Sequence, residues 1–136
     1  MSPTLAHALA DLVLFVHAGV VAFNIFWMVA IPLGGWLGWR FVRAFWWRAA
    51  HVASLLVVAI QPLLGRYCFL TLWQDALDAA AGPAVEPNWF ERLATTIVFW
   101  PLPPWLFVYL YIAAFAWTAL LWWLVPPQRR AGTLVP

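Results

Sequence analysis

The chain has 136 residues, of which 66% are hydrophobic and 9% are charged. Soluble domains contain about 45–50% apolar residues, so this composition indicates a protein of the lipid bilayer. The basic residues give a formal net charge of +2, and they flank apolar stretches instead of clustering, which argues against a nucleic-acid-binding surface. A single cysteine excludes an intrachain disulfide and any multi-cysteine metal site within the chain.

The first apolar stretch, residues 12–39, contains no charged side chain. Pro32 and the following Gly34-Gly35 predict that a helix ends there, which places a first transmembrane helix near residues 11–32. About 20 apolar residues suffice to cross a bilayer. The amino terminus lacks the basic segment of a secretory signal, so we expect this helix to be retained.

The second predicted transmembrane helix, near residues 45–65, carries most of the unusual polar chemistry. His51, Ser54 and Gln61 recur at a spacing that puts them on one helical face. Polar side chains within a membrane usually face protein. We therefore expect this face to meet the first helix, on which His17 and Asn24 also share a face.

The region from 68 to 101 is predicted to lie at the outer membrane interface. Thr71 followed by Gln74 fits a helix capping box, which indicates a short interfacial helix that stops at Gly82. Residues 89–100 are apolar but too short to cross in the usual way. They either lie on the membrane, dip into it or, in a four-span alternative, cross it.

The third predicted transmembrane helix, near 105–125, has 21 uncharged residues and aromatic residues at both ends. The chain is thus expected to form one all-α membrane domain, residues 1–136, with three transmembrane helices and short outer interfacial helices. Five of the seven arginines fall on one side of this topology. The positive-inside rule then predicts an external amino terminus and a cytoplasmic carboxyl terminus in a bacterial inner membrane.

The two intramembrane histidines allow two interpretations. Helical rise predicts His17 at the depth of Gln61 and His51 at the depth of Asn24, so two interhelical hydrogen bonds explain all four residues. The alternative is haem or quinone binding by the histidines. The expected axial offset of about 12 Å opposes a shared haem iron, and we expect neither a cofactor nor a metal.

Cys68 lies where the second helix leaves the membrane, beside Arg66 and Tyr67. A nearby cation could lower the pKa of this thiol and make it reactive, but the sequence favours an inert, half-buried thiol. If the protein is an enzyme, its centre is expected at Cys68 with His17. No recognised catalytic motif is present.

A family resemblance rests on three short patterns. Asp11-x-Val13-x-x-x-His17, the early His51 of the second helix, and Cys68-x-Leu70-Thr71-x-x-Gln74-x-x-Leu77 resemble domain of unknown function 2784, a family of small bacterial membrane proteins. The family has proline and glutamate where this chain has Phe69 and Gln74. The resemblance implies a three- or four-span membrane protein, assigns no activity, and singles out His17, His51, Cys68 and Thr71.

The function expected from the sequence is that of an accessory or scaffold subunit. Three helices bury one another only partly, so lipid, a partner subunit or a second copy of the chain must cover the remaining apolar surface. The alternatives are an electron-transfer protein that binds haem or quinone through His17 and His51, and a small membrane enzyme built on Cys68. The candidate functional or structural polar residues are His17, Asn24, His51, Ser54, Gln61, Cys68, Thr71 and Gln74.

Overall fold

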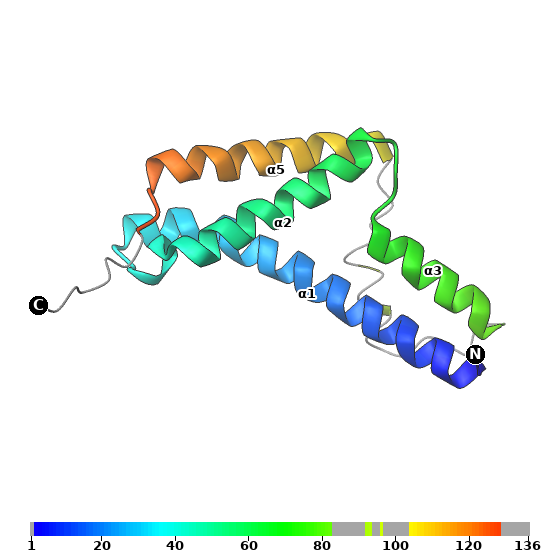
Figure 1. The fold of residues 1–136 in the computed structure, drawn as a ribbon. Coiled ribbons are helices and arrows are strands. Elements are labelled where there is room, and N and C mark those ends of the chain that lie inside the picture. The colour runs from blue at the N-terminus through cyan, green and yellow to red at the C-terminus, as the bar shows by residue number, and fades with distance from the viewer. Residues whose placement is uncertain (1, 83–91, 94–95, 97–103, 129–136) are drawn as a thin grey trace, which may run out of the picture.

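The computed structural model describes residues 2–82, 92–93, 96 and 104–128. In this part of the chain the named elements are α1 (Pro3–Trp36), the 3-10 helix η1 (Phe41–Arg43), α2 (Phe45–Leu63), α3 (Phe69–Ala81) and α5 (Pro104–Leu124) (Figure 1). The all-α fold expected from the sequence is therefore confirmed. Most of the segment 89–100 lies outside the described residues.

Helix α1 is longer than the sequence predicts. It begins after Ser2, whose side chain accepts a hydrogen bond from the backbone N–H of Leu5, and it runs for 34 residues through Pro32. At 1.5 Å per residue it is about 51 Å long, well beyond the ~20 residues that cross a bilayer. The predicted end at Pro32 is wrong because a proline removes only one intrahelical donor, and the last turn is held by packing.

The stop signal for α1 is Gly38, with a φ of 74°. The N–H of Leu37 donates to the carbonyl of Leu33 at 2.9 Å, and the N–H of Trp39 donates to that of Gly34 at 2.7 Å. Such bonds satisfy the free carbonyls of a last turn, and glycine adopts the left-handed backbone that they need. The residues Gly34 and Gly35, in contrast, lie within the helix and serve its packing.

Close packing explains both of these helical glycines. A Cβ atom on Gly34 would lie 2.6 Å from Cγ1 of Val42, and one on Gly35 would lie 2.7 Å from Cγ2 of Val125. Both distances are too short for real carbon atoms, so only glycine lets η1 and the end of α5 approach α1 this closely.

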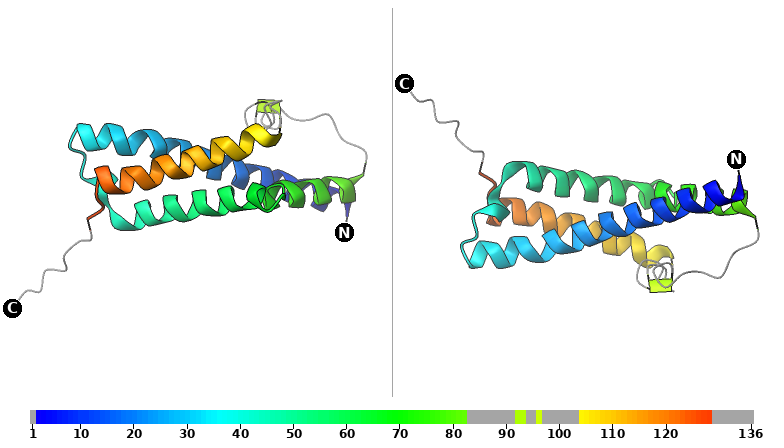
Figure 2. Two further views of the ribbon diagram at one scale, coloured as in Figure 1. Left: turned by 90° about the horizontal axis from the view of Figure 1, so that it is seen from above. Right: turned by 90° about the horizontal axis from the view of Figure 1, so that it is seen from below.

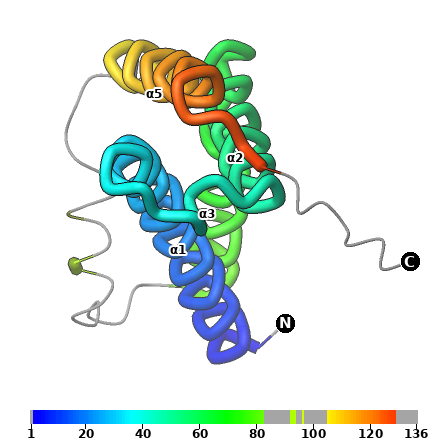
Figure 3. The backbone as a smooth tube through the Cα atoms, turned by 90° about the vertical axis from the view of Figure 1, so that its left-hand side faces the viewer, coloured from blue at the N-terminus to red at the C-terminus, as the bar shows by residue number. Residues whose placement is uncertain are grey.

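The described α-helices are arranged in two pairs, α1 with α3 and α2 with α5. Helices α2 and α3 follow one another and both run opposite to α1, with α3 against the amino-terminal half of α1 (Figures 1 and 2). Helix α5 packs along α2, and viewed end-on it lies beside α2, whereas α3 lies beside α1 (Figure 3). The chain after α5 is tied to the segment before α2, because the N–H of Gln128 donates to the carbonyl of Arg43 at 2.6 Å.

Helix α3 begins three residues earlier than the capping box predicts. Cys68 is its N-cap residue, and Thr71 lies inside the first turn. The side chain of Gln61, from the end of α2, accepts a hydrogen bond from the N–H of Phe69 at 2.7 Å. Because a distant side chain satisfies this first free amide, Thr71 and Gln74 are not needed as a cap. The predicted stop at Gly82 is confirmed, with a φ of 92°.

The main hydrophobic core lies where the end of α1 meets η1, α2 and α5. Trp27 stacks on Trp47 with ring centroids 6.2 Å apart and meets Phe41 edge-on. The buried members of this core are Trp27, Ala30, Ile31, Val42, Leu121 and Val125. Helix α3 packs lengthwise on α1, where Ala6, Ala10 and Leu14 are buried.

By length and composition, two described helices could cross a membrane, Pro3–Trp36 and the apolar part of α5, Trp105–Leu124. The sequence predicted three such helices, and α2 is not among the two. Its interior carries Arg48, His51, Ser54 and Gln61, which make it less apolar than α1 or α5.

Candidate functional site

The structure brings together two residues that the sequence had singled out separately, His17 and Cys68. His17 lies in the middle of α1 with 8% of its surface exposed, and Cys68 is half-buried at the start of α3. The two side chains lie close enough for His17 to act on the thiol of Cys68. They meet because α3 packs lengthwise along α1, which places the first residue before α3 beside the fifteenth residue of α1.

The surroundings of Cys68 favour its thiolate form. Burial raises the pKa of the thiol, but the hydrogen bond and charge of His17 and the backbone amides of Leu70 and Thr71 act against burial. Their combined effect is a pKa below the usual range of a cysteine. Free amides at a helix start stabilise negative charge, so the position of Cys68 before α3 and its contact with His17 act in the same direction.

Thr71 and Gln74 follow Cys68 in the first turns of α3, where both are half-buried. Tyr111 of α5 is close enough to interact electrostatically with Cys68. The sequence analysis missed Tyr111, although a hydroxyl within an apolar predicted span was the available signal.

The chemical capacity of this arrangement is that of an activated thiol. A cysteine becomes nucleophilic when its pKa is lowered and a base lies within hydrogen-bond reach. His17 supplies the second condition, and the α3 amides contribute to the first. The pair therefore has the composition of a cysteine–histidine nucleophile.

A second polar level lies further along α1, at Asn24. Its side-chain amide donates to the hydroxyl of Ser54 at 2.8 Å and to the carbonyl of Val20 at 2.8 Å. His51 is fully buried, lies next to the backbone of Asn24, and meets the ring of Phe23 edge-on at 6.2 Å. The predicted side-chain partner of Asn24 was His51, and the structure gives Ser54, one turn further along the same face of α2.

The predicted pair of His17 with Gln61 is also replaced. Gln61 donates to the carbonyl of Val57 at 3.0 Å and accepts from the N–H of Phe69 at 2.7 Å. Its amide is thus used to join the end of α2 to the start of α3. A depth estimate from helical rise cannot find this arrangement, because it assumes straight, parallel helices with a common surface.

The placement of the two histidines opposes a shared haem. His17 lies beside Cys68, whereas His51 lies beside Asn24, seven residues further along α1. At 1.5 Å per residue this separates the two levels by about 10 Å, too far for opposed ligands on one iron. In the part of the chain that the structure describes, no group of three or more His, Cys, Asp or Glu residues could hold a metal ion.

Arg48 is a buried charge that the sequence analysis treated only as an orientation signal. Its two terminal nitrogens donate to the carbonyls of Val125 and Leu121 at 2.8 and 2.9 Å, and its guanidinium lies 5.5 Å from the ring centre of Trp122. These carbonyls lie in and just after the last turn of α5, where a helix carries partial negative charge. Arg48 of α2 therefore caps the carboxyl-terminal end of α5. The sequence signal for this role was an arginine within an apolar helical pattern.

The family comparison agrees with the patterns around His17, His51 and Cys68. A family model described as Protein of Unknown function (DUF2784) matches residues 7–127. A search of the curated proteins and of the solved structures found no match. The matched range includes all the described helices except the first turn of α1. The chain therefore belongs to the DUF2784 family, whose function is unknown.

Proposed function

We propose that this chain is a small integral membrane protein in which Cys68, activated by His17, acts as a nucleophile at the membrane boundary. The proximity of His17 to Cys68 is the observation that carries the proposal. It brings a histidine from the middle of an apolar helix beside a cysteine at the start of another helix. An ionisable residue within an apolar membrane helix is costly, and such residues usually have a functional role.

The proposed topology has three crossings, α1, α2 and α5, in a bacterial inner membrane. Helix α2 has 19 residues, about 28 Å at 1.5 Å per residue, and its one arginine is turned toward α5 carbonyls. Because this charge does not face lipid, α2 is compatible with a crossing. The arginines around η1 then lie on the cytoplasmic side, with the amino terminus outside.

This topology places the thiol near the outer boundary. Cys68 follows the end of α2, and His17 is about 20 residues from the carboxyl-terminal end of α1 at Trp36, which is the length of one crossing. The first half of α1 and α3 then extend beyond that level. A nucleophile at this depth can meet an amphiphilic substrate that resides in the membrane.

Acyl transfer suits the pair better than disulfide exchange. The chain has one cysteine, so it holds no second thiol to resolve a mixed disulfide. In the proposed step the thiolate sulfur of Cys68 attacks an acyl carbonyl carbon, and His17 holds the thiol proton. The leaving group departs with that proton, and the acyl group remains on sulfur as a thioester.

The test compares thiol reactivity in purified protein held in mild detergent. Cys68 should be alkylated by iodoacetamide at neutral pH several-fold faster in the wild type than in His17→Ala, with the pH profile of the variant shifted upward. His7→Ala, another histidine of α1, is the matched control and should react like the wild type. An activated p-nitrophenyl ester should acylate the wild type and leave Cys68→Ser unlabelled.

Equal alkylation rates and pH profiles in the wild type and His17→Ala would show an ordinary thiol and end the proposal. Labelling of Cys68→Ser by the ester would exclude the cysteine as the acylated group.

A second candidate function, an accessory subunit, is favoured by the apolar surface of the described helices. Trp36 and Trp123 are each 84% exposed and Trp46 is 81% exposed, and large exposed apolar areas indicate lipid or protein contacts. Such a subunit would be recovered from membranes in a larger complex after mild-detergent purification. A chain that purifies alone and still shows the activated thiol supports the nucleophile and contradicts the subunit.

A further inference from the structure

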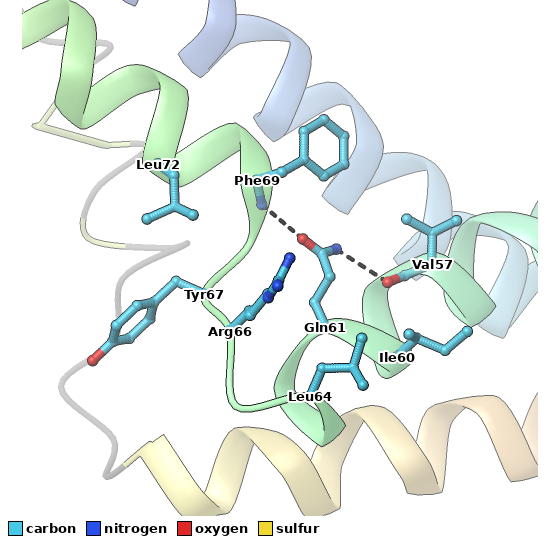
Figure 4. Close-up of a pocket in the computed structure, with 8 residues that line it drawn as sticks. All are labelled: Val57, Ile60, Gln61, Leu64, Arg66, Tyr67, Phe69 and Leu72. Carbon is cyan, nitrogen blue, oxygen red and sulfur yellow. Dashed lines mark hydrogen bonds between the residues drawn. The ribbon is translucent and has the colours of Figure 1, made fainter.

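An apolar groove lies between the end of α2 and the start of α3, on residues that the proposed nucleophile does not use. Its volume is about 360 Å³, within the ~300–1,000 Å³ of small-molecule sites. Figure 4 shows the eight side chains that line it, with Arg66 between Tyr67 on one side and Gln61 on the other. The lining residues are Val57, Ile60, Gln61, Leu64, Arg66, Tyr67, Phe69 and Leu72.

The two most polar lining residues, Gln61 and Arg66, differ in whether their side chains can bind a ligand. Gln61 uses its amide on Val57 and Phe69 (Figure 4), so it shapes the groove and offers little to a ligand. Arg66 is exposed, and no acidic side chain is among the lining residues. The groove thus combines an apolar wall with one positive charge.

We propose that this groove binds one anionic phospholipid of the surrounding bilayer. An acyl chain would lie against Val57, Ile60 and Leu64, and the phosphate would bind the guanidinium of Arg66. Arginine binds phosphate through two parallel hydrogen bonds. The proposal rests on the membrane location of the chain and not on the chemistry of Cys68.

The charge pattern favours this occupant over a protein segment. A partner helix presents an apolar face several turns long, whereas this groove is lined only by the last turns of α2 and the first turn of α3, with Arg66 between them. An amphiphile combines an apolar chain with one charged group, which matches the apolar side chains and the single arginine of this groove. Arg66 also directly follows the last turn of α2, where the proposed topology places lipid head groups.

Native mass spectrometry of the full chain in detergent tests the proposal, with phosphatidylglycerol and phosphatidylcholine of identical acyl chains supplied in equal amounts. The wild type should retain phosphatidylglycerol preferentially. Arg66→Gln should weaken that binding about fivefold, the effect of one basic residue at a membrane surface, and Arg66→Lys should keep most of it. Arg40→Gln, an exposed arginine at the other end of the molecule, is the matched control.

The apolar half of the site has its own variant. Leu72→Trp partly fills the groove and should lower retention of both lipids while alkylation of Cys68 stays as in the wild type. Equal retention of the two lipids by the wild type, or unchanged preference in Arg66→Gln, would overturn the proposal. Loss of the preference when millimolar inorganic phosphate is added would show a simple anion site and overturn it as well. A preference that survives phosphate supports a lipid.

Discussion

The two halves of α1 have different partners and different chemistry. Its amino-terminal half packs on α3 and holds His17 against the half-buried thiol of Cys68. Its carboxyl-terminal half packs on η1, α2 and α5, in a core of stacked aromatic rings beside the fully buried Arg48. Each half thus holds one basic side chain against a specific partner. His17 lies beside Cys68, and Arg48 bonds to the carbonyls at the end of α5.

The comparison separates a structural polar contact from a reactive one. Arg48 has permanent charge, and both of its terminal nitrogens bond to backbone carbonyls, so its contact is structural. His17 and Cys68 can each gain or lose a proton, and their contact changes which form of the thiol is favoured. Variants of Arg48 and its core should therefore affect stability, and variants of His17 and Cys68 should affect reactivity.

The largest effect on stability is expected from Arg48→Ala. Two hydrogen bonds from a charged donor are lost, and at about 1.5 kcal/mol each the protein should lose about 3 kcal/mol. Unfolding by sodium dodecyl sulfate, followed by circular dichroism, measures this loss. Arg48→Lys keeps the charge but cannot reach both carbonyls as well, so it should lose about half as much.

The control for Arg48 is the exposed Arg40. Its change to alanine should stay within about 0.5 kcal/mol of the wild type. Similar losses from Arg48→Ala and Arg40→Ala would contradict the capping role of Arg48.

The next largest effect on stability is expected from variants that test the close packing of the carboxyl-terminal half of α1. Gly34→Ala puts a methyl group 2.6 Å from a methyl group of Val42, and such overpacking costs about 1–3 kcal/mol. In Gly19→Ala the new methyl group has no neighbour within 4 Å, so the same substitution should stabilise α1 by about 0.5–1 kcal/mol. The same detergent unfolding measures both variants. Equal signs for the two changes would refute the close approach of η1 to α1.

A smaller effect is expected between the two halves, at Asn24 and Ser54. A double-mutant cycle with Asn24→Ala and Ser54→Ala should give a coupling energy of about 0.6 kcal/mol, and no more than about 1.7 kcal/mol, if the proposed membrane location holds, because interhelical hydrogen bonds measured in membranes have this range. His51→Ala combined with Asn24→Ala tests the pairing that sequence spacing had suggested. Coupling confined to that second cycle would contradict the bond to Ser54.

The smallest effect concerns pH and the contact between α1 and α3. Burial, followed by the charges of Asp75 and Asp11, raises the pKa of Asp78, and His7 and Gln74 only partly oppose this. A carboxyl group with a raised pKa binds its proton more tightly in the folded state. Stability from this group is therefore full at pH below the pKa of the unfolded chain and is lost as pH rises through the folded pKa.

Asp78→Asn should remove this pH dependence and slightly stabilise α3 on α1 at neutral pH. Amide hydrogen exchange of α3 between mildly acidic and neutral pH measures the effect. Protection that increases with pH in the wild type over this window would contradict the assigned sign.

Sequence patterns predicted local structure well where the decisive interactions are local. The predicted helices near 45–65 and 105–125 agree closely with α2 and α5, because apolar periodicity and flanking proline or glycine act within a few residues. The predictions failed at Pro32 and Thr71. Helix α1 continues past Pro32 to the turn at Gly38, and the amide of Phe69 is already satisfied by the side chain of Gln61 from outside α3.

The sequence by itself determined the composition of the candidate site, since His17, Cys68 and Thr71 stand out as polar residues in an apolar chain. Only the tertiary structure decided their partners. The contact between His17 and Cys68, and the hydrogen bonds of Arg48 to α5, join residues 51 and more than 70 positions apart. Such pairs follow from which helices pack together, and that choice depends on the summed fit of whole helix faces and not on any short motif.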